Sequence, residues 1–311
     1  LYSVQDENGE VALCTLSAVN LGALDSLDEL EDITEIIVRS LDCLLDYQDY
    51  PLKSAEITSN NRRTLGIGVT NLAYYLAKND AKYSDGSGNE LIHKTFEALQ
   101  FYSLKASNKL AIEFGACPLF SETQYAQGIL PVDSYKKDID VFCNTKLELD
   151  WDSLRKDIKA SGLRNSTLTA LMPCESSSQI SNSTNGIEPP RGFVSVKQSK
   201  DGILKQVVPE YEKLHKKYEL LWDIKDNEGY LQLCAIMQKF VDQSISTNTH
   251  YDPSKFEGNR VPMKLFLMDL LKAYKYGIKT LYYHTTRDGA SDDQSINNPS
   301  DDDCEDGVCK L

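Results

Sequence analysis

The sequence is poor in positive charge. Its 33 Lys and Arg residues face 47 Asp and Glu residues, and the formal net charge is −14. A nucleic-acid groove needs clustered cations, so this balance argues against direct nucleic-acid binding. Long apolar runs are missing too: none approaches the roughly 20 residues that cross a bilayer, and no signal-peptide pattern opens the chain. We therefore expect no membrane segment and a cytoplasmic location.

The sequence also lacks the spacings that hold metal ions. It contains no CxxC pair, and its cysteines and histidines do not show the spacing of a zinc site. We therefore predict no metal and no other cofactor within this chain. In the reducing compartment expected without a secretory signal, a disulfide would be catalytic rather than structural. The cysteines are Cys14, Cys43, Cys117, Cys143, Cys174, Cys234, Cys304 and Cys309, and the histidines are His93, His215, His250 and His284.

What the chain does contain is enough apolar sequence for a substantial core. It has 311 residues, 41% hydrophobic and 26% charged, which is ordinary for a globular protein. Helical patterns alternate with short apolar runs, which predicts an α/β fold with a mainly parallel sheet. From Ser291 onward Asp, Asn, Ser and Gln dominate, which predicts a disordered acidic tail. We divide the chain into a folded part, 1–290, and a tail, 291–311.

Individual patterns predict the elements of the folded part. Residues 11–21 read as a strand that is apolar and buried on both faces. Ser26 and Glu29 resemble a capping box ahead of a helix. The apolar stripe of that helix is Leu30, Ile33, Ile37, Leu41 and Leu44. Further helices are expected around Tyr74 and Tyr75, at 91–114 before Gly115, at 211–222, at 230–242, and from Pro262 to Gly277. Further strands are expected at 193–196, 243–246 and 278–284, and residues 118–160 read as surface connections.

The stretch TLTALMPCESSSQISNSTNGIEPPRG, residues 167–192, joins a β-like run to a serine-rich turn and a short helix. Pro173 stops the β-like run, and Glu175, Ser176, Ser177 and Ser178 follow. The first N–H groups of a helix lack internal partners, and the helix dipole favours negative charge there. The pattern therefore fits an anion site, and it equally fits an ordinary helix cap with solvated serines.

Three further groups of residues could carry chemistry. Cys304 and Cys309 flank Glu-Asp-Gly-Val in the tail, where they are either a dithiol for thiol–disulfide exchange or incidental cysteines. Cys14 lies in the expected buried strand, where packing alone would explain it.

Tyr282 and Tyr283 are adjacent phenols that could relay an oxidising equivalent. Neighbouring residues of a regular strand point to opposite faces, so a relay through both needs a local distortion. Otherwise one of them is a core tyrosine and the other a surface tyrosine. Tyr74 and Tyr75 are an equally good pair by composition.

These motifs together resemble the large, catalytic subunit of class I ribonucleotide reductase. PCESSSQISNSTNGIEPPRG resembles its substrate-diphosphate loop. CTLSAVNLG, RRTLGIGVTNLAYYLAK, GILPVDSYKKD, KDGILKQVVPEYE, DQSISTNTHYDPS, KTLYYHTTRDGA and the CEDGVCKL end follow the family in order. The resemblance covers essentially the whole chain, and only the C-terminal portion of such a subunit.

The resemblance implies a fold and roles for particular residues. The fold would be the second half of a ten-stranded α/β barrel with surrounding helices. Glu175, Ser176, Ser177 and Ser178 would bind the diphosphate of a ribonucleoside diphosphate. Cys14 would be half of the active-site dithiol, and Tyr282 and Tyr283 would transfer the radical. Cys304 and Cys309 would re-reduce the active site and be reduced by thioredoxin or glutaredoxin.

One family motif is absent. The radical-forming cysteine of the family lies in an Asn-x-Cys-x-Glu motif, which occurs nowhere in these 311 residues. The chain also begins with Leu1 rather than Met. We therefore expect a processed, truncated or separately encoded piece that is inactive alone. It would need an N-terminal part, which also binds ATP and dNTP effectors, and a small subunit with a metal-radical cofactor. The alternatives are a stand-alone dithiol carrier or interaction module, and an expression truncation without biological meaning.

Overall fold

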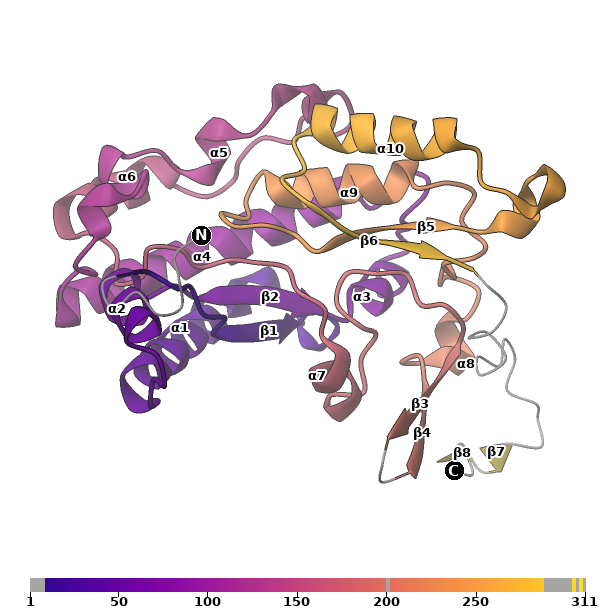
Figure 1. Cartoon of the computed structure of the whole chain (residues 1–311), viewed down its shortest axis with the longest axis horizontal. Helices are drawn as coiled ribbons and strands as arrows, with labels where there is room; N and C mark the ends of the chain where they lie inside the picture. The colour runs from indigo at the N-terminus through magenta and orange to yellow at the C-terminus, as the bar shows by residue number, and fades with distance from the viewer. Residues whose placement is uncertain (1–8, 200–201, 288–303, 306–307, 310–311) are drawn as a thin grey trace.

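The computed structural model describes residues 9–199, 202–287, 304–305 and 308–309, and Figure 1 traces the chain through them. Its helices and strands are β1 (Leu16–Asn20), α1 (Leu30–Tyr47), α2 (Lys53–Arg62), β2 (Gly66–Thr70), α3 (Leu72–Lys78), α4 (Asn89–Phe114), α5 (Pro131–Ser134), α6 (Trp151–Ser161), α7 (Glu175–Ile180), β3 (Val194–Ser199), β4 (Gly202–Val207), α8 (Tyr211–Leu214), α9 (Glu228–Gln238), β5 (Thr247–Tyr251), α10 (Met263–Tyr276), β6 (Leu281–Thr286), β7 (Cys304–Glu305) and β8 (Val308–Cys309). Short 3₁₀ turns lie at Leu21–Ala23, Leu27–Glu29, Phe120–Glu122, Tyr125–Gln127, Lys137–Val141, Pro253–Lys255 and Glu257–Asn259.

The extended segments that form the array lie side by side and run parallel. β1 pairs with β2 in parallel, and β5 pairs with β6 in parallel. Residues 167–172 lie between the two pairs: a parallel bridge joins Thr169 to Ile67 of β2, and another joins Leu171 to Ile245 just before β5. The expected α/β fold with mainly parallel pairing is therefore confirmed. In the described part of the chain the array is open at β1 and β6 and forms no closed barrel.

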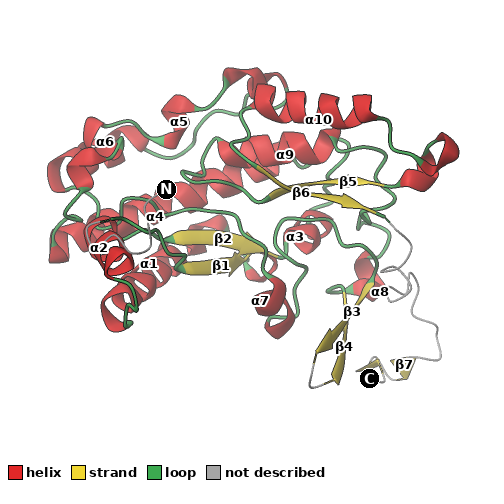
Figure 2. Ribbon diagram, viewed as in Figure 1, coloured by secondary structure: helices red, strands yellow, loops and turns green. Residues whose placement is uncertain are grey.

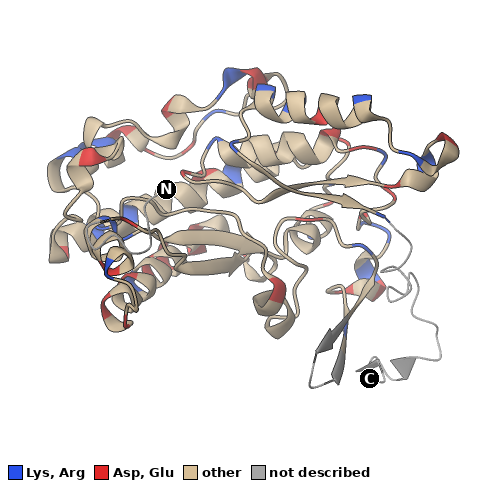
Figure 3. Cartoon of the chain, viewed as in Figure 1, with Lys and Arg blue, Asp and Glu red and all other residues tan. Residues whose placement is uncertain are grey.

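Helices pack beside this array in a continuous layer. α1 packs on α4, α4 on α9, and α9 on α10, and Figure 2 shows α9 and α10 stacked beside β5 and β6. α4 lies at the centre of the core, and Phe96, Leu99 and Leu104 on it are almost completely buried. Figure 3 shows the charged residues on helices and turns, whereas β1, β2, β5 and β6 contain none. Among the described helices none is long and apolar enough to cross a membrane.

Several helix boundaries follow the predicted signals. The backbone N–H of Ser26 donates to Glu29 Oε1 at 2.9 Å, which confirms the capping box before α1. α4 ends at Gly115 and α10 at Gly277, whose φ angles of 86° and 88° lie where only glycine is unstrained. Pro262 directly precedes α10, also as predicted.

A close backbone contact explains one of the two glycines of β2. A Cβ on Gly68 would lie 2.8 Å from the carbonyl oxygen of Ala170, so only glycine lets residues 167–172 approach β2. Gly68 is therefore a packing residue.

The predicted strands were placed less well. The strand expected at 11–21 begins only at Leu16, and Leu16 is 45% exposed because β1 has a hydrogen-bonded partner along one edge alone in the described structure. The strand expected at 243–246 is displaced to β5. The sequence of β5, TNTHY, is polar, and yet Thr247 and Thr249 are fully buried.

Three helical predictions also need correction. Leu30 and Leu41 of the stripe predicted for α1 are buried, as expected, but Leu44 is 49% exposed. Thr34, Val38 and Leu45 are buried as well, so the buried face is rotated by about one position. The helix expected at 211–222 ends at Leu214 as α8. Residues 118–160 are not only surface connections, since they include most of α6, whose Trp151, Leu154 and Ile158 belong to the core.

A histidine is buried without hydrogen-bond partners in this core. His93 on α4 is 2% exposed, and its ring lies edge-on to Phe240 with centroids 4.9 Å apart. Within the described structure neither of its ring nitrogens has a hydrogen-bond partner. Burial lowers the pKa of His93 from 6.5 to about 4. The folded chain therefore holds this ring neutral at a pH where the unfolded chain protonates it.

Replacing His93 by Leu should flatten the acid side of the stability curve. Between pH 6.5 and about 4 the unfolded wild type binds one more proton at this residue, so its free energy of unfolding falls as pH falls. That fall should be steeper than in His93→Leu by about 1.4 kcal/mol per pH unit. Urea unfolding across this range measures both slopes. Above about pH 7 the two curves should run parallel, and equal slopes on the acid side would contradict the assignment.

Candidate active site

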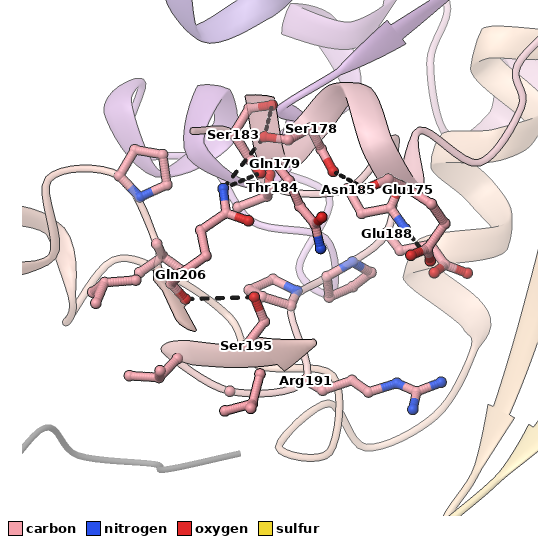
Figure 4. A pocket seen from close by; sticks show the side chains of 18 residues that line it. Glu175, Ser178, Gln179, Ser183, Thr184, Asn185, Glu188, Arg191, Ser195 and Gln206 are labelled. Atoms are coloured by element: carbon pink, nitrogen blue, oxygen red, sulfur yellow. Dashed lines mark hydrogen bonds between the residues drawn. The ribbon is translucent and has the colours of Figure 1, made fainter. Parts of the chain in front are cut away.

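A cavity of about 340 Å³ lies beside α7 and the hairpin of β3 and β4. Figure 4 shows α7 on one side and Ser195 and Gln206 from the hairpin opposite it. Of the four residues predicted to bind the diphosphate, Glu175 and Ser178 line this cavity. The described lining residues are Glu175, Ser178, Gln179, Ser183, Thr184, Asn185, Glu188, Pro189, Pro190, Arg191, Gly192, Val194, Ser195, Val196, Gln206, Val207, Val208 and Pro209.

α7 begins where the middle segment of the array ends. Pro173 follows residues 167–172, and the N–H of Cys174 donates to Asn185 Oδ1 at 2.7 Å. Cys174 occupies the N-cap position without a side-chain hydrogen bond to the helix. Its thiol instead points to the carbonyl oxygen of Val69 at 3.6 Å, and burial raises the thiol pKa. The start of α7 is thus left without the hydroxyl cap that a serine would offer there.

The predicted serines differ in their surroundings. Ser176 and Ser177 are exposed, whereas Ser178 is 3% exposed and its hydroxyl donates back to the carbonyl oxygen of Glu175 at 3.2 Å. Glu175 Oε1 accepts from Asn185 Nδ2 at 2.9 Å. The hydroxyl of Ser178 is therefore used within α7, and the backbone at the start of the helix is the better anion donor.

Charged groups from the following loop also reach the cavity, and sequence reasoning assigned them no role. Arg191 is the cation among its described lining residues. Glu188 adds an acidic group to the same lining. Burial raises the pKa of Glu188, whereas the hydrogen bond from Asn248 and the charge of Arg191 act to lower it. The string EPPRG contains both residues, and its paired prolines were the available signal that this loop is held in a defined shape.

Cys14 is not part of this cavity. It lies two residues before β1 and is exposed, so the expectation of a cysteine inside a buried strand is wrong. α7 lies beyond the other end of the β1–β2 pair, because Cys174 contacts Val69 near the end of β2 (Figure 1). Along the strand direction, Cys14 and the contact at Val69 are therefore about five residues apart, a distance of roughly 16 Å.

Tyr282 and Tyr283 form a ring pair through an irregularity in the sheet. Thr247 pairs with Leu281, but Thr249 pairs with His284, so β6 has two residues where β5 has only Asn248. Such a bulge cancels the usual alternation of faces. The two tyrosine rings lie with centroids 4.0 Å apart and are 50% and 59% exposed. The distortion that a relay requires is present.

The rival pair, Tyr74 and Tyr75 on α3, points to two different partners. The hydroxyl of Tyr74 donates to Glu210 at 3.1 Å, and that of Tyr75 lies 3.0 Å from Thr95 Oγ1. Tyr75 is buried, and its pKa is raised by that burial. The geometry therefore favours Tyr282 and Tyr283 as a phenol pair.

The tail predictions fall mostly outside the described residues. The backbones of β7 and β8 pair antiparallel, with Cys304 opposite Cys309. The side chains of these two cysteines and the tail from Ser291 to 303 lie outside the described part. In the described part of the chain no cluster of three or more His, Cys, Asp or Glu residues could hold a metal ion.

Comparison with known proteins finds a matching family model and several similar proteins. Residues 2–284 match the family model described as "Ribonucleotide reductase, barrel domain". The chain is 66% identical over 311 residues to the ribonucleoside-diphosphate reductase subunit alpha of Haemophilus influenzae, a match that covers 100% of this chain and 41% of that protein. It is 66% identical over 269 residues to the ribonucleoside-diphosphate reductase 1 subunit alpha of Escherichia coli, covering 86% of this chain and 35% of that protein. The subunit alpha of Enterobacteria phage T4 is 50% identical over 313 residues, covering 99% and 41%. The chain thus spans about two fifths of the length of the curated relatives it matches.

The exposure of the cysteines predicts which of them react with a thiol reagent. A short maleimide pulse on the folded chain should modify Cys14 and Cys43, which are exposed, well before the buried Cys174 and Cys234. Burial raises the pKa of Cys234 to about 12, so its thiolate is scarce as well as covered. Peptide-resolved mass spectrometry measures the four rates. Equal modification after unfolding is the control, and fast modification of Cys174 in the folded chain would contradict its placement beside β2.

Proposed function

The chain belongs to the ribonucleotide reductase family through its barrel domain and corresponds to a C-terminal portion of the large subunit. From that membership we propose that it supplies the substrate cradle and a tyrosine relay to an enzyme that reduces ribonucleoside diphosphates to deoxyribonucleoside diphosphates. The single observation that carries the proposal is the ring pair of Tyr282 and Tyr283, which a regular strand would not form.

The diphosphate of the substrate would bind at the start of α7. Glu175, Ser176, Ser177 and Ser178 would contribute chiefly backbone N–H groups, with the exposed hydroxyls of Ser176 and Ser177 in addition. The positive end of the helix dipole and the cation of Arg191 both favour an anion in the adjoining cavity. Glu175 and Glu188 would then face away from the phosphates or toward hydroxyl groups, because two carboxylates repel an anion.

The oxidising equivalent would pass through Tyr283 and then Tyr282. It would come from the metal-radical cofactor of a small subunit and continue to a cysteine that this chain lacks. Centroids 4.0 Å apart bring the two rings into van der Waals contact. A hydrogen bond with Tyr283 raises the pKa of Tyr282, which keeps that phenol protonated until it is oxidised. The greater exposure of Tyr283 suits the partner-facing position.

Thiols would supply the electrons. Cys14 would be half of an active-site dithiol whose other cysteine lies in the N-terminal part of the subunit, and its exposure leaves it accessible to such a partner. Cys304 and Cys309 would re-reduce that disulfide and be reduced by thioredoxin or glutaredoxin. A reducing cytoplasm is the compartment that this chemistry requires.

An N-terminal part would complete the fold and bind the ATP and dNTP effectors. In the described structure β1 hydrogen-bonds only β2, and Leu13 and Leu16 beside its free edge are 39% and 45% exposed. A free parallel edge with apolar side chains favours pairing with another segment. We propose that this part adds the remaining strands of a ten-stranded barrel and that the chain alone is inactive.

Substitution of the tyrosines tests the proposed function in the assembled enzyme. The chain, an N-terminal large-subunit segment and a small subunit of the family should together reduce a ribonucleoside diphosphate. Tyr282→Phe or Tyr283→Phe should lower turnover to background, because phenylalanine cannot be oxidised at accessible potentials, while nucleotide binding persists. Product formation and equilibrium binding are measured on the same preparations.

Tyr74→Phe is the matched control. It removes one phenol of the rival pair and should keep nucleotide reduction near the wild-type rate. Turnover that persists in Tyr282→Phe would contradict the proposed relay. A wild-type assembly that exchanges thiols with thioredoxin but never reduces a nucleotide would favour a dithiol carrier instead.

A further inference from the structure

The bulge that pairs the two tyrosines leaves a backbone donor in need of a partner. Where two residues of β6 oppose one residue of β5, the regular ladder is interrupted. The N–H of Tyr283 donates instead to the side chain of Asn248, at 2.9 Å from its Oδ1. The ladder resumes at once, with Thr249 opposite His284 and their side chains 2.6 Å apart. One side chain therefore satisfies the backbone at the irregular position.

The amide of Asn248 is held from its other end by a carboxylate. Asn248 is 8% exposed, and its Nδ2 donates to Glu188 Oε1. The orientation of the amide is determined by its partners: the N–H of Tyr283 can only donate, and an ionised carboxylate can only accept. A flipped amide would oppose donor to donor and acceptor to acceptor.

Glu188 connects this bulge to the cavity. Its side chain is 30% exposed and lines the cavity, with Glu175 close by (Figure 4). His250 Nε2 lies 3.6 Å from Glu188 Oε1, and burial lowers the pKa of His250 to about 4, so the ring is a neutral neighbour. A continuous chain of contacts thus runs from the cavity wall through Glu188 and Asn248 to the backbone of Tyr283.

We propose that Asn248 is a positioning residue that holds the rings of Tyr282 and Tyr283 on one face, and that Glu188 anchors it to the wall of the substrate cavity. The inference rests on the proposed function for its importance to turnover. Without the acceptor at Asn248, the part-buried N–H of Tyr283 loses its partner within the protein, and a shift of β6 toward regular register would restore a ladder bond. Regular register turns the two phenols to opposite faces.

An exchange of the amide and the carboxylate tests the pair. Asn248→Asp places two carboxylates in contact, so their repulsion should displace the aspartate from the N–H of Tyr283 and the rings should separate. Glu188→Gln keeps the bond, because the glutamine oxygen still accepts from Asn248. The double variant N248D/E188Q restores the hydrogen bond between the two side chains with donor and acceptor exchanged. The glutamine amide donates to the aspartate, whose other oxygen accepts from the N–H of Tyr283.

The first measurement needs no activity. A fluorotyrosine at position 283 of the chain gives one fluorine signal, and Tyr282→Leu removes the neighbouring ring. The change that Tyr282→Leu causes in the fluorine chemical shift reports ring contact. It should be large in the wild type and in Glu188→Gln, nearly absent in Asn248→Asp, and regained in the double variant. Asn60→Asp, at an exposed asparagine of α2, is the matched control and should leave it unchanged.

The second measurement is turnover of the assembled enzyme. Displacing a positioned group by about 1 Å can cost about 10²-fold in rate, so kcat should fall by that order in Asn248→Asp, with KM nearly unchanged, and recover in the double variant. Ring contact that persists in Asn248→Asp, or that the double variant fails to restore, would overturn the inference. If the fluorine signals respond as expected while the wild-type assembly reduces no nucleotide, the proposed function fails and the positioning role of Asn248 stands.

Discussion

The position of residues 167–172 between β2 and the segment before β5 is the constraint on which the site depends. This segment alternates its backbone bonds: the N–H of Ala170 donates to Ile67, and that of Leu171 donates to Ser244. Asp242 accepts the N–H groups of Leu168 and Thr169 at 2.8 and 2.9 Å. A segment bonded on both sides cannot slide by one residue without losing these contacts and reversing its faces. Its end therefore delivers Pro173 and α7 to one place beside the cavity.

Local chemistry made the helices predictable. Gly115 and Gly277 end α4 and α10 because the left-handed backbone there costs glycine little, and Pro262 precedes α10 because a helix start needs no N–H from it. These effects involve only a few neighbouring residues, so the local sequence reveals them. β5 escaped prediction because Thr247 and Thr249 are polar residues in a fully buried place, and the partner of Thr249, His284, lies 35 residues away in sequence.

The site was predictable only as far as the resemblance reached. The resemblance pointed to α7 and to the tyrosine pair as candidates, and strand geometry added that the pair requires a distortion. The particular bulge could not be read from YYHTT, because it depends on Asn248 in another strand and on Glu188 in a third segment. Arg191 was likewise passed over, since its role at the cavity depends on how the loop after α7 returns toward the hairpin.

The distribution of charge bears on the phenol relay that we propose for Tyr282 and Tyr283. β1, β2, β5 and β6 contain no charged residue, so the strands themselves offer an isolated charge no ionic partner. A phenol that lost only an electron would become a cation beside these uncharged strands, whereas one that loses an electron and a proton together stays neutral. The rings of Tyr282 and Tyr283 are half exposed and in mutual contact, so each has a route for its proton, unlike Tyr83 and Tyr230, whose pKa values burial raises far above 10.0. Tyr282 and Tyr283 thus combine ring contact with exposure to solvent that can take up a proton, and this combination favours the neutral transfer that we propose for them.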